Sequence, residues 1–537
     1  MTGVAADTRQ IAEENAKIAA EVQEMLKQPL KQMLKDNRAD IDHIMGSSVD
    51  FQKRDFMLCG SADRPGICCY VDGLVDTVIV ESILKALIVF GGELHHEPDK
   101  LPSAEDIRAR LMINASVKPC LKLGEGITAV MSGDTLVLIE GFDEGILVST
   151  KGWKDRGVEE PASENNVRGP RDGFSESIRT NTAHVRRRIR DPQLRIDGMV
   201  IGTRSKTDIN IAYIADLVKI GLVDEVKQRL GRIKIDAILE SGYVEEMIED
   251  APFSPFNTIQ STERPDKVAS ALLEGRVAIF IDNTPVVLVV PSFFWQFIQA
   301  PDDYYHRYWV GTFFRFVRYC AFMISLVLPS IYVMLVSFHH EMIPTSLALT
   351  IASGREVVPF PVLLEALLME FAFELMREAG LRMPKPIGQA VSIVGSLIIG
   401  QAAVQAGLVS PFMVIVVAIT GISSFAIPSY SSSLALRIFR FPLLIASGLF
   451  GLLGFATVFF ALLLHALSIR SFGESYLAPA SPFSRTAQRD MVLRLPMWMM
   501  DYRPEFAQDS VRSGEHLMPE PDKGNGNGKG NGKDGSQ

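Results

Sequence analysis

The sequence lacks the short motifs by which most enzymes and metal proteins are recognised. It contains no G-x-x-x-x-G-K-[ST] phosphate loop, no G-x-S-x-G nucleophile turn, no H-E-x-x-H zinc motif and no G-x-G-x-x-G that follows a strand. The run His339, His340 and Glu341 has no partner four residues away, as a metal site on a helix would need. We therefore expect no catalytic residues, no metal site and no cofactor in this chain, which we expect not to be an enzyme.

Cysteines are few and follow no recognisable spacing. The five cysteines form no C-x-x-C pair, and an odd number does not suit a disulfide framework. We therefore expect the N-terminal part to lie on the reducing, cytoplasmic side of a membrane. The net charge of −9 argues against a nucleic-acid partner. Residues 1–40 lack the apolar core of a secretory signal, so membrane insertion would depend on later segments.

Charged residues are absent from one long stretch, Ile387 to Leu436. These fifty residues contain no Asp, Glu, Lys, Arg or His. A bilayer core about 30 Å thick takes about 20 apolar residues per helical crossing, so the stretch has room for two helices. Gly407 and Pro411 bracket the break between them, because a tight reversal favours these residue types. The stretch therefore predicts a membrane hairpin.

Composition divides the chain into a mixed N-terminal region and an apolar C-terminal region. The chain is 47% hydrophobic, and the excess falls between residues 311 and 470. We expect an α+β soluble N-terminal region of two α/β subdomains, followed by an all-α polytopic membrane domain of four to five helices. The expected divisions are a helical extension (1–50), a first α/β subdomain (51–150), a second α/β subdomain (151–300), a membrane domain (301–470), a C-terminal segment (471–510) and a disordered Gly- and Asn-rich tail (511–537).

Local patterns predict elements inside the soluble subdomains. Ile127 to Ile139 suggests a β-hairpin that turns at Ser132 to Asp134, and Ala278 to Val290 suggests another. Between these hairpins we expect strands at 194–203 and 234–239 and helices at 208–220, 223–231 and 241–248.

A cluster of arginines occupies the segment between Gly157 and Arg195. Its members are Arg168, Arg171, Arg179, Arg186, Arg187, Arg188, Arg190 and Arg195. One interpretation is a patch that binds phosphate or anionic lipid. The other, which we favour, is that these arginines pair with Asp172, Glu176 and Asp191 on a surface helix and at subunit contacts.

The expected first span runs from Phe313 to Phe338. Arg315 and Arg318 stand at its start, and positive residues favour the cytoplasmic side of a membrane. We therefore expect the N-terminal domain to be cytoplasmic.

The expected last span runs from Phe441 to Leu464. Arg437 and Arg440 precede it and mark a second cytoplasmic edge. Between the first span and the hairpin, Val362 to Gly380 reads as a helix that carries glutamates. The total is five spans if this helix crosses the membrane and four if it is buried without crossing.

Polar groups at helical spacing inside these apolar segments form the candidate site. Its members are Gln389, Ser392 and Ser396 in the first arm of the hairpin and Glu370, Glu374 and Glu378 in the preceding helix. Arg377 lies on the same stripe as the glutamates, and Glu365 lies on the far side. One hypothesis is a water-filled ion path in an oligomer, where the glutamates favour cations. The alternative is close helix packing, where the polar groups bond across helices.

Several long runs resemble the A subunit of GerA-type spore germinant receptors. They are RGPRDGFSESIRTNTAHVRRRIRDPQLRI (168–196), SKTDINIAYIADLV (205–218), EMIPTSLALTIASGREVVPFP (341–361), LMEFAFELMREAGLRMPKPIGQAVSIVGSLIIGQAAVQAGLVSP (368–411), SSFAIPSY (423–430) and RLPMWMMDYRP (494–504). The resemblance covers about residues 55–506. Residues 1–50 and the tail match poorly, so no function is assigned to them.

The resemblance implies a subunit of a nutrient germinant receptor. Such a protein is a multi-pass protein of the spore inner membrane, with its N-terminal domain on the core side. The family picture is a homo-oligomer, a pentamer, that conducts cations when nutrient binds and so triggers germination. It works with a transporter-like B subunit, thought to bind the nutrient, and with a lipoprotein C subunit.

Other functions remain open beside this one. The AF protein of the SpoVA type shares the RDGF and RRRIRDP region, so the chain could be a channel paralogue that amplifies the germination signal. The run IPTSLALTIASGREVVPFP (343–361) and the hairpin favour the receptor instead. A non-conducting membrane scaffold for receptor assembly is a further alternative. A proton-coupled transporter would predict inverted repeats, which the sequence does not show.

Overall fold

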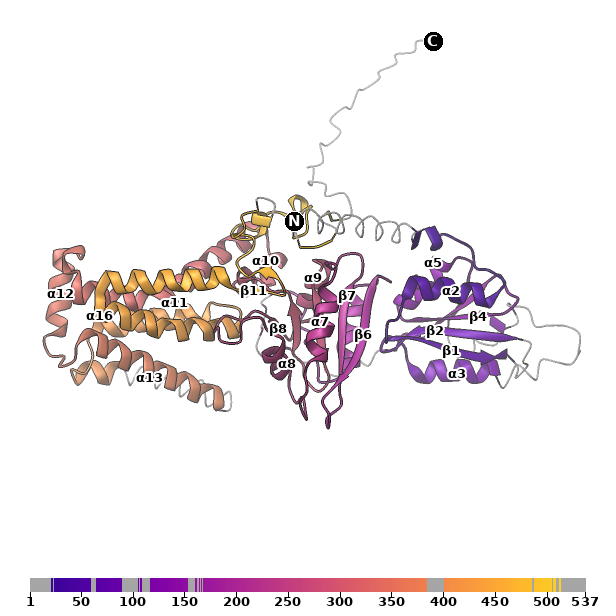
Figure 1. Cartoon of the computed structure of the whole chain (residues 1–537), viewed down its shortest axis with the longest axis horizontal. Helices are drawn as coiled ribbons and strands as arrows, with labels where there is room; N and C mark the ends of the chain where they lie inside the picture. Colours follow the sequence, from indigo (N-terminus) through magenta and orange to yellow (C-terminus); the bar gives the residue numbers. More distant parts are fainter. Residues whose placement is uncertain are drawn as a thin grey trace, which may run out of the picture.

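The computed structural model shows an elongated molecule in which two sheets and a bundle of helices follow one another along the longest axis (Figure 1). The structure describes residues 21–22, 24–58, 64–88, 105, 107–108, 116–152, 160–161, 164, 166, 168–383, 400–484, 487–504, 506–508 and 511–512. The second sheet lies between the first sheet and the helices. Soluble and apolar parts of the chain are therefore separated in space as they are in sequence.

The first sheet is antiparallel and has the strand order β1-β2-β4-β5-β3. Its strands are β1 (Phe51–Met57), β2 (Pro65–Val71), β3 (Val117–Cys120), β4 (Asp134–Ile139) and β5 (Gly145–Ser149). Helices α2 (Leu34–Met45) and α5 (Leu123–Met131) cover one face, and α3 (Thr77–Ile88) covers the other. Successive side chains of a strand point to opposite faces, so Cys69 enters one core and Cys68 the other.

The second sheet is also antiparallel, with the order β6-β7-β9-β10-β8. Its strands are β6 (Leu194–Ile201), β7 (Thr207–Ile214), β8 (Gln260–Thr262), β9 (Val277–Ile281) and β10 (Val287–Val290). Helices α6 (Ile178–Arg188) and α9 (Pro265–Leu273) pack on one face, and α7 (Leu222–Gly231) and α8 (Ser241–Ile248) pack on the other. The N-terminal region is therefore built from sheets with helices on both faces, which confirms the first half of the expected fold class.

Three local expectations in this region are wrong. Residues 207–214 form strand β7 where a helix was expected, because buried Ile209 and Ile211 repeat with a period of two. Residues 123–131 form helix α5 instead of a hairpin strand, since Leu123, Ile127 and Val130 are buried at helical spacing. The structure has no strand at 234–239. The hairpin of β9 and β10 and the helix at 241–248 are confirmed.

A buried ion pair joins the two subdomains. Arg186 of α6 donates hydrogen bonds from Nε and Nη2 to the Asp50 carboxylate at 2.7 and 2.9 Å. Its Nη1 donates to the Leu194 carbonyl at 2.8 Å. Arg186 is 0% exposed and Asp50 is 9% exposed. Within the arginine cluster, Arg188 pairs with Asp172, as the ion-pairing interpretation expects. Arg186 is instead buried, and its partner Asp50 is not one of the three expected acids.

From residue 308 to residue 468 the described chain is mostly helical. Its longer helices are α11 (Tyr308–Phe338), α12 (Thr345–Arg355), α13 (Val362–Arg382), α15 (Pro411–Phe425) and α16 (Tyr430–Ser468). By length and composition, α11 and α16 are long and apolar enough to cross a membrane, and the apolar α15 has only 15 residues. These helices are compatible with a helical membrane region, and the number of four to five spans stays a prediction.

The expected hairpin lies only partly within the described residues. Its first arm, up to residue 399, lies outside them. The reversal is confirmed, since Gly407 has a φ of 67° and α15 begins at Pro411. The second arm ends at Phe425, because Pro428 lacks the N–H that would continue the helix. Helix α16 then begins at Tyr430, before the expected span, and Gly451, with a φ of 60°, divides it into two helical parts.

This early start of α16 corrects the expectation for two arginines. Arg437 and Arg440 lie inside the helix and are 8% and 1% exposed, so they do not mark a solvent-facing edge. Their guanidinium groups must therefore find partners inside the bundle.

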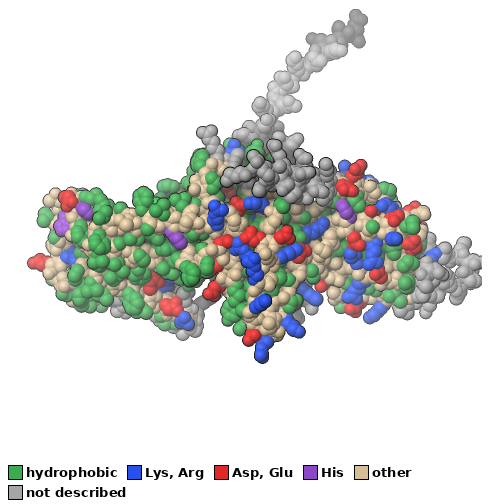
Figure 2. Space-filling view, in the orientation of Figure 1, with side chains coloured by type: hydrophobic (Ala, Val, Ile, Leu, Met, Phe, Trp, Pro, Cys, Tyr) green, Lys and Arg blue, Asp and Glu red, His purple; other side chains and the backbone are tan. Residues whose placement is uncertain are grey.

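Apolar side chains cover the surface of the helical part (Figure 2). Examples of strongly exposed residues are Phe313, Ile422, Phe425, Leu453 and Phe460. Charged side chains are much more frequent over the two sheets. Because a water-soluble protein rarely exposes so much continuous apolar surface, this face suits lipid or further protein.

The chain after α16 returns to the second sheet. Its short elements are β11 (Arg470–Ser471), β12 (Glu474–Ser475), η5 (Ala487–Asp490) and η6 (Met497–Met499). The Ser292 amide donates to Ser471 Oγ at 3.0 Å, and the Phe294 amide donates to the Tyr476 carbonyl at 2.9 Å. Soluble region, membrane-type helices and C-terminal segment therefore meet at one junction beside α10 (Asp302–Tyr305).

We expect Asp50→Ala to lower the free energy of unfolding by about 3 kcal/mol, because it leaves the Arg186 guanidinium buried without a carboxylate. Urea titration of the purified chain, followed by circular dichroism, measures the loss. Asp55→Ala is the matched control, since it removes an exposed ion pair with Arg38 and should cost less than about 1 kcal/mol. Equal losses in the two variants would contradict the role given to Asp50.

Candidate functional site

Helix α13 carries the candidate glutamates that the structure describes. It begins directly after Pro361, whose ψ of 150° is not helical. The helix packs against α11, α15 and α16, and its sequence is otherwise apolar. Carboxylates on its inner sides therefore meet protein side chains.

Glu370 forms an almost fully buried ion pair in the bundle. Arg440 Nη1 of α16 donates to Glu370 Oε2 at 2.5 Å, and both side chains are 1% exposed. The same guanidinium donates from Nε to the Ser325 carbonyl at 2.9 Å and from Nη2 to Ser325 Oγ at 3.0 Å. Ser325 belongs to α11, so this pair holds three helices together.

Glu374 forms a second layer one helical turn further along α13. Arg437 Nη1 donates to Glu374 Oε2 at 3.3 Å, and Arg377 Nη1 lies 3.7 Å from Glu374 Oε1. Arg377 also donates to Ser424 Oγ of α15 at 2.8 Å. Its guanidinium lies 4.9 Å from the centre of the Phe373 ring and 4.8 Å from that of Phe425, within cation–π distance.

Glu365 forms a third layer near the start of α13. Its Oε1 accepts hydrogen bonds from the amide and the hydroxyl of Ser410, each at 2.6 Å. Arg355 Nη2 lies 3.6 Å from Glu365 Oε2. Ser410 also caps α15, because its hydroxyl accepts from the Met413 amide. Glu365 thus fixes the reversal of the predicted hairpin.

Together these side chains form what we call the ion-pair row. It consists of Glu365, Glu370, Glu374, Arg355, Arg377, Arg437 and Arg440. Three carboxylates face four guanidinium groups, so the row as it stands has no surplus of negative charge. Glu365 Oε2, Glu370 Oε1 and Glu374 Oε1 are buried without a hydrogen-bond partner among the described residues. The row is therefore paired in charge but incompletely hydrogen-bonded.

The structure describes three of the six predicted site residues, and their surroundings differ. Glu370 and Glu374 are brought together in the ion-pair row. Glu378 lies at the outer end of α13, where it pairs with Arg382 at 2.6 Å, with both side chains more than half exposed. Gln389, Ser392 and Ser396 lie outside the described residues. No group of three or more metal-ligating side chains occurs within the part of the chain that the structure describes.

The arginine partners on α16 were missed by the sequence interpretation, although a signal for them exists. Glu370 and Glu374 are four residues apart in one apolar segment, and Arg437 and Arg440 are three apart in another. Glu370 pairs with Arg440 and Glu374 with Arg437, in reversed order, as antiparallel helices require. Opposite charges at matching spacing in two apolar segments therefore indicate a helix pair.

The comparisons with known sequences match this chain to spore germination and sporulation proteins. The family model described as "Bacillus/Clostridium GerA spore germination protein" matches residues 39–506. Spore germination protein KA of Bacillus subtilis (strain 168) is 43% identical over 517 residues, which cover 94% of this chain and 92% of that protein. Stage V sporulation protein AF of the same organism is 32% identical over 469 residues, which cover 87% of this chain and 93% of that protein.

Among solved structures, the chain is similar to the N-terminal domain of the A subunit of the Bacillus megaterium spore germinant receptor GerK3. The sequences are 34% identical, the match covers 50% of this chain and 98% of that chain, and the TM-score is 0.39. The family match and the curated relatives confirm the resemblance found in the sequence runs.

We expect Glu370→Gln to destabilise the helical bundle by about 3–5 kcal/mol, because Arg440 stays charged and buried without its partner. The double variant Glu370→Leu with Arg440→Leu should recover most of this loss, since no charge remains buried. Thermal unfolding of the purified chain in detergent measures both effects.

Glu378→Gln provides the matched control, because it removes an exposed pair on the same helix and should cost less than about 1 kcal/mol. A double variant that is no more stable than Glu370→Gln would mean that the pair itself does not set the stability.

Proposed function

Because the chain belongs to the GerA family of spore germination proteins, we propose that it is the A subunit of a nutrient germinant receptor whose copies form a ligand-gated cation channel. The family implies a receptor complex with other subunits. We place this chain in the spore inner membrane as a multi-pass protein with its N-terminal domain on the core side. Its proposed partners are a nutrient-binding B subunit and a lipoprotein C subunit.

The ion-pair row is the observation that carries the channel proposal. Charged side chains inside a membrane domain cost several kcal/mol each unless they are paired, and they usually mark an ion path, a relay or a switch. Here they lie between α13, α15 and α16, in a bundle with an apolar outer surface. Apolar side chains of the same volume would pack the helices equally well.

We assign the paired arrangement to the closed state. Arg440 holds Glu370 and Arg437 holds Glu374, so neither carboxylate is offered to a passing cation. Sliding or rotation of α16 against α13 would separate both pairs and leave free carboxylates, which attract cations. The unbonded oxygens of Glu370 and Glu374 support this assignment, because an incompletely bonded pair is easier to separate than a saturated one.

In the proposed mechanism, nutrient acts on the channel by binding to the partner B subunit. A B subunit shifts the equilibrium only if it binds the open and closed arrangements with different affinity. Moving a two-state equilibrium from about 1% to about 99% open takes about 5.5 kcal/mol. Copies of the A subunit in one ring would share this free energy, so each contributes only part of it.

The path itself requires several copies of the chain. Four or five helices are too few to surround an aqueous channel and also to bury the ion-pair row. We therefore propose a homo-oligomer, with the pentamer taken from the family resemblance. The stripe of Gln389, Ser392 and Ser396 is proposed to line the path, with Glu370, Glu374 and Glu378 next to it.

Two other functions compete with the channel. An AF-like amplifier would share the membrane architecture, but sequence identity is higher to protein KA than to protein AF, which supports the receptor. A non-conducting scaffold would use the ion-pair row only to hold helices together. The scaffold and the channel differ in what happens to ions when a pair is broken.

We expect dormant spores that carry Arg440→Gln to lose potassium without nutrient, because Glu370 then lacks its cation and the closed arrangement is weakened. Potassium release into the medium measures this leak, and an immunoblot measures the abundance of the chain. Arg440→Lys keeps the charge and should leak much less.

The exchanged pair, Glu370→Arg with Arg440→Glu, separates the channel from the scaffold. It restores opposite charges at the same place, so it should close the leak again. Normal potassium retention at normal abundance, in Arg440→Gln and also in Arg437→Gln, would overturn the channel proposal and favour the scaffold.

A further inference from the structure

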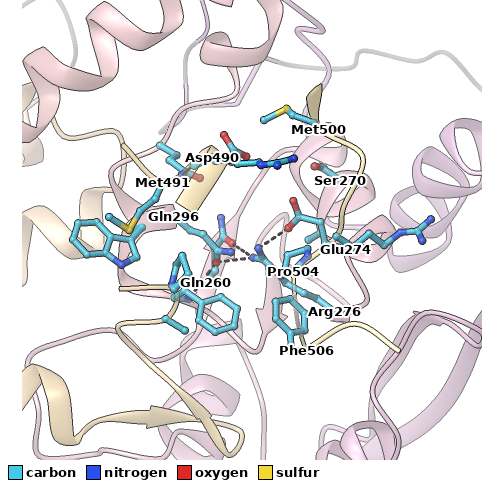
Figure 3. Close-up of a pocket in the computed structure, with 18 of the residues that line it drawn as sticks. Gln260, Ser270, Glu274, Arg276, Gln296, Asp490, Met491, Met500, Pro504 and Phe506 are labelled. Atoms are coloured by element: carbon cyan, nitrogen blue, oxygen red, sulfur yellow. Dashed lines mark hydrogen bonds and ion pairs between the residues drawn. The ribbon is translucent and has the colours of Figure 1, made fainter. Parts of the chain in front are cut away.

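A cavity of about 610 Å³ lies at the junction of the second sheet, α10 and the C-terminal segment (Figure 3). Gln260 and Ser270 come from β8 and α9, and Asp490, Met500 and Phe506 come from the C-terminal segment. The volume is within the range of about 300–1,000 Å³ typical of small-molecule sites. Two parts of the chain that are distant in sequence therefore form one pocket.

Arg276 is held in a fixed position in the lining of this cavity. The side chain is 4% exposed. Its Nη1 donates to Gln296 Oε1 at 2.6 Å and its Nη2 to Glu274 Oε2 at 2.6 Å (Figure 3). The guanidinium lies 5.7 Å from the Phe293 ring centre and 5.9 Å from that of Phe506. A group held in this way loses little entropy when it helps to bind a ligand.

The carboxylates that line the cavity already have cationic partners. The pairs are Asp266 with Arg264, Glu274 with Arg276, Glu474 with Lys219, and Asp490 with Arg315. Arg470 and Arg489 also line the cavity, and within the described part of the chain neither is within ion-pair distance of a carboxylate. The cavity therefore has a surplus of positive charge.

A further part of the lining is apolar, with several flat aromatic rings. It includes Phe293, Trp295, Met491, Met500, Pro504 and Phe506. Rings and thioethers of this kind pack against an apolar or aromatic body. We propose that the cavity binds a small organic anion with an apolar body, such as an aromatic carboxylate or a phosphate ester. This proposal stands whether or not the helices conduct ions.

The cavity lies next to residues that anchor the start of α11. Asp490 accepts a hydrogen bond from Tyr304 Oη at 2.6 Å, and its Oδ1 lies 2.9 Å from Arg315 Nη1 at the start of α11. Burial raises the pKa of the Asp490 carboxyl, while Arg315 and Tyr304 oppose that shift. A bound anion would contact the sheet and the C-terminal segment together, and so would hold the segment that anchors α11.

The test is a titration of the full chain in phosphatidylcholine nanodiscs with phenyl phosphate and with benzoate. Binding is followed by tryptophan fluorescence, because Trp295 lines the cavity. We expect a saturable change with at least one of the two anions and none with neutral benzamide. The double variant Arg470→Gln with Arg489→Gln should bind at least tenfold more weakly. Ser270→Trp, which fills the cavity from an exposed position, should abolish binding.

Arg204→Gln is the matched control, since Arg204 is exposed on the turn between β6 and β7 and does not line the cavity. It should bind as the parent chain does. Competition by phosphatidylglycerol in the nanodiscs would identify a lipid head group as the source of the anion, and its absence would identify a soluble one. The proposal is overturned if neither anion binds saturably, if benzamide binds equally well, or if the double variant keeps full affinity.

Discussion

The architecture of the helical part depends on the burial of charge between α13 and α16. Glu370 and Arg440 are both almost fully buried, and each is a costly group to hold in an apolar bundle without the other. Because Arg440 also bonds to Ser325 of α11, the pair fixes three helices in one arrangement. The neighbouring layers at Glu374 and Glu365 extend this constraint to α15 and to the reversal that precedes it. A movement of α13 against α16 must therefore break or exchange ion pairs, and a movement of α11 or α15 must break hydrogen bonds to the same charged side chains.

A second group of buried charges connects this bundle to the soluble region. Arg315 and Arg318, at the start of α11, pair with Asp303 of α10, and Arg315 also pairs with Asp490 of the C-terminal segment. The soluble region, the first long helix and the returning chain are thus joined by charged contacts. Asp490 lines the proposed anion-binding cavity and also pairs with Arg315 of α11. A change at the cavity therefore acts on α11 through this ion pair.

The sequence pattern predicted the apolar stretch and its reversal better than it predicted individual strands and side-chain contacts. The charge-free stretch and the Gly407 to Pro411 reversal were visible because they depend on local composition alone. Strand β7 was mistaken for a helix because its alternation of Ile209 and Ile211 is mixed with apolar Ala212 and Ile214, which blurs the period of two. The partners of Glu370 and Glu374 could not be read from one segment, since they lie about seventy residues further on, at separations of 70 and 63 residues. Tertiary contacts of this kind appear in a sequence only as matched spacing of opposite charges.

The most direct test of an ion path is the water accessibility of the polar stripe. Cysteines placed one at a time at Gln389, Ser392 and Ser396, in a chain whose five native cysteines are replaced by serine, would be exposed to a charged, membrane-impermeant thiol reagent in membrane vesicles. Val394→Cys and Ile398→Cys are the controls, because the predicted helical spacing puts these two positions on the side opposite the stripe. The account predicts that the reagent labels the stripe and spares the two controls. Equal labelling of both sides, or no labelling of the stripe in stably inserted protein, would contradict it.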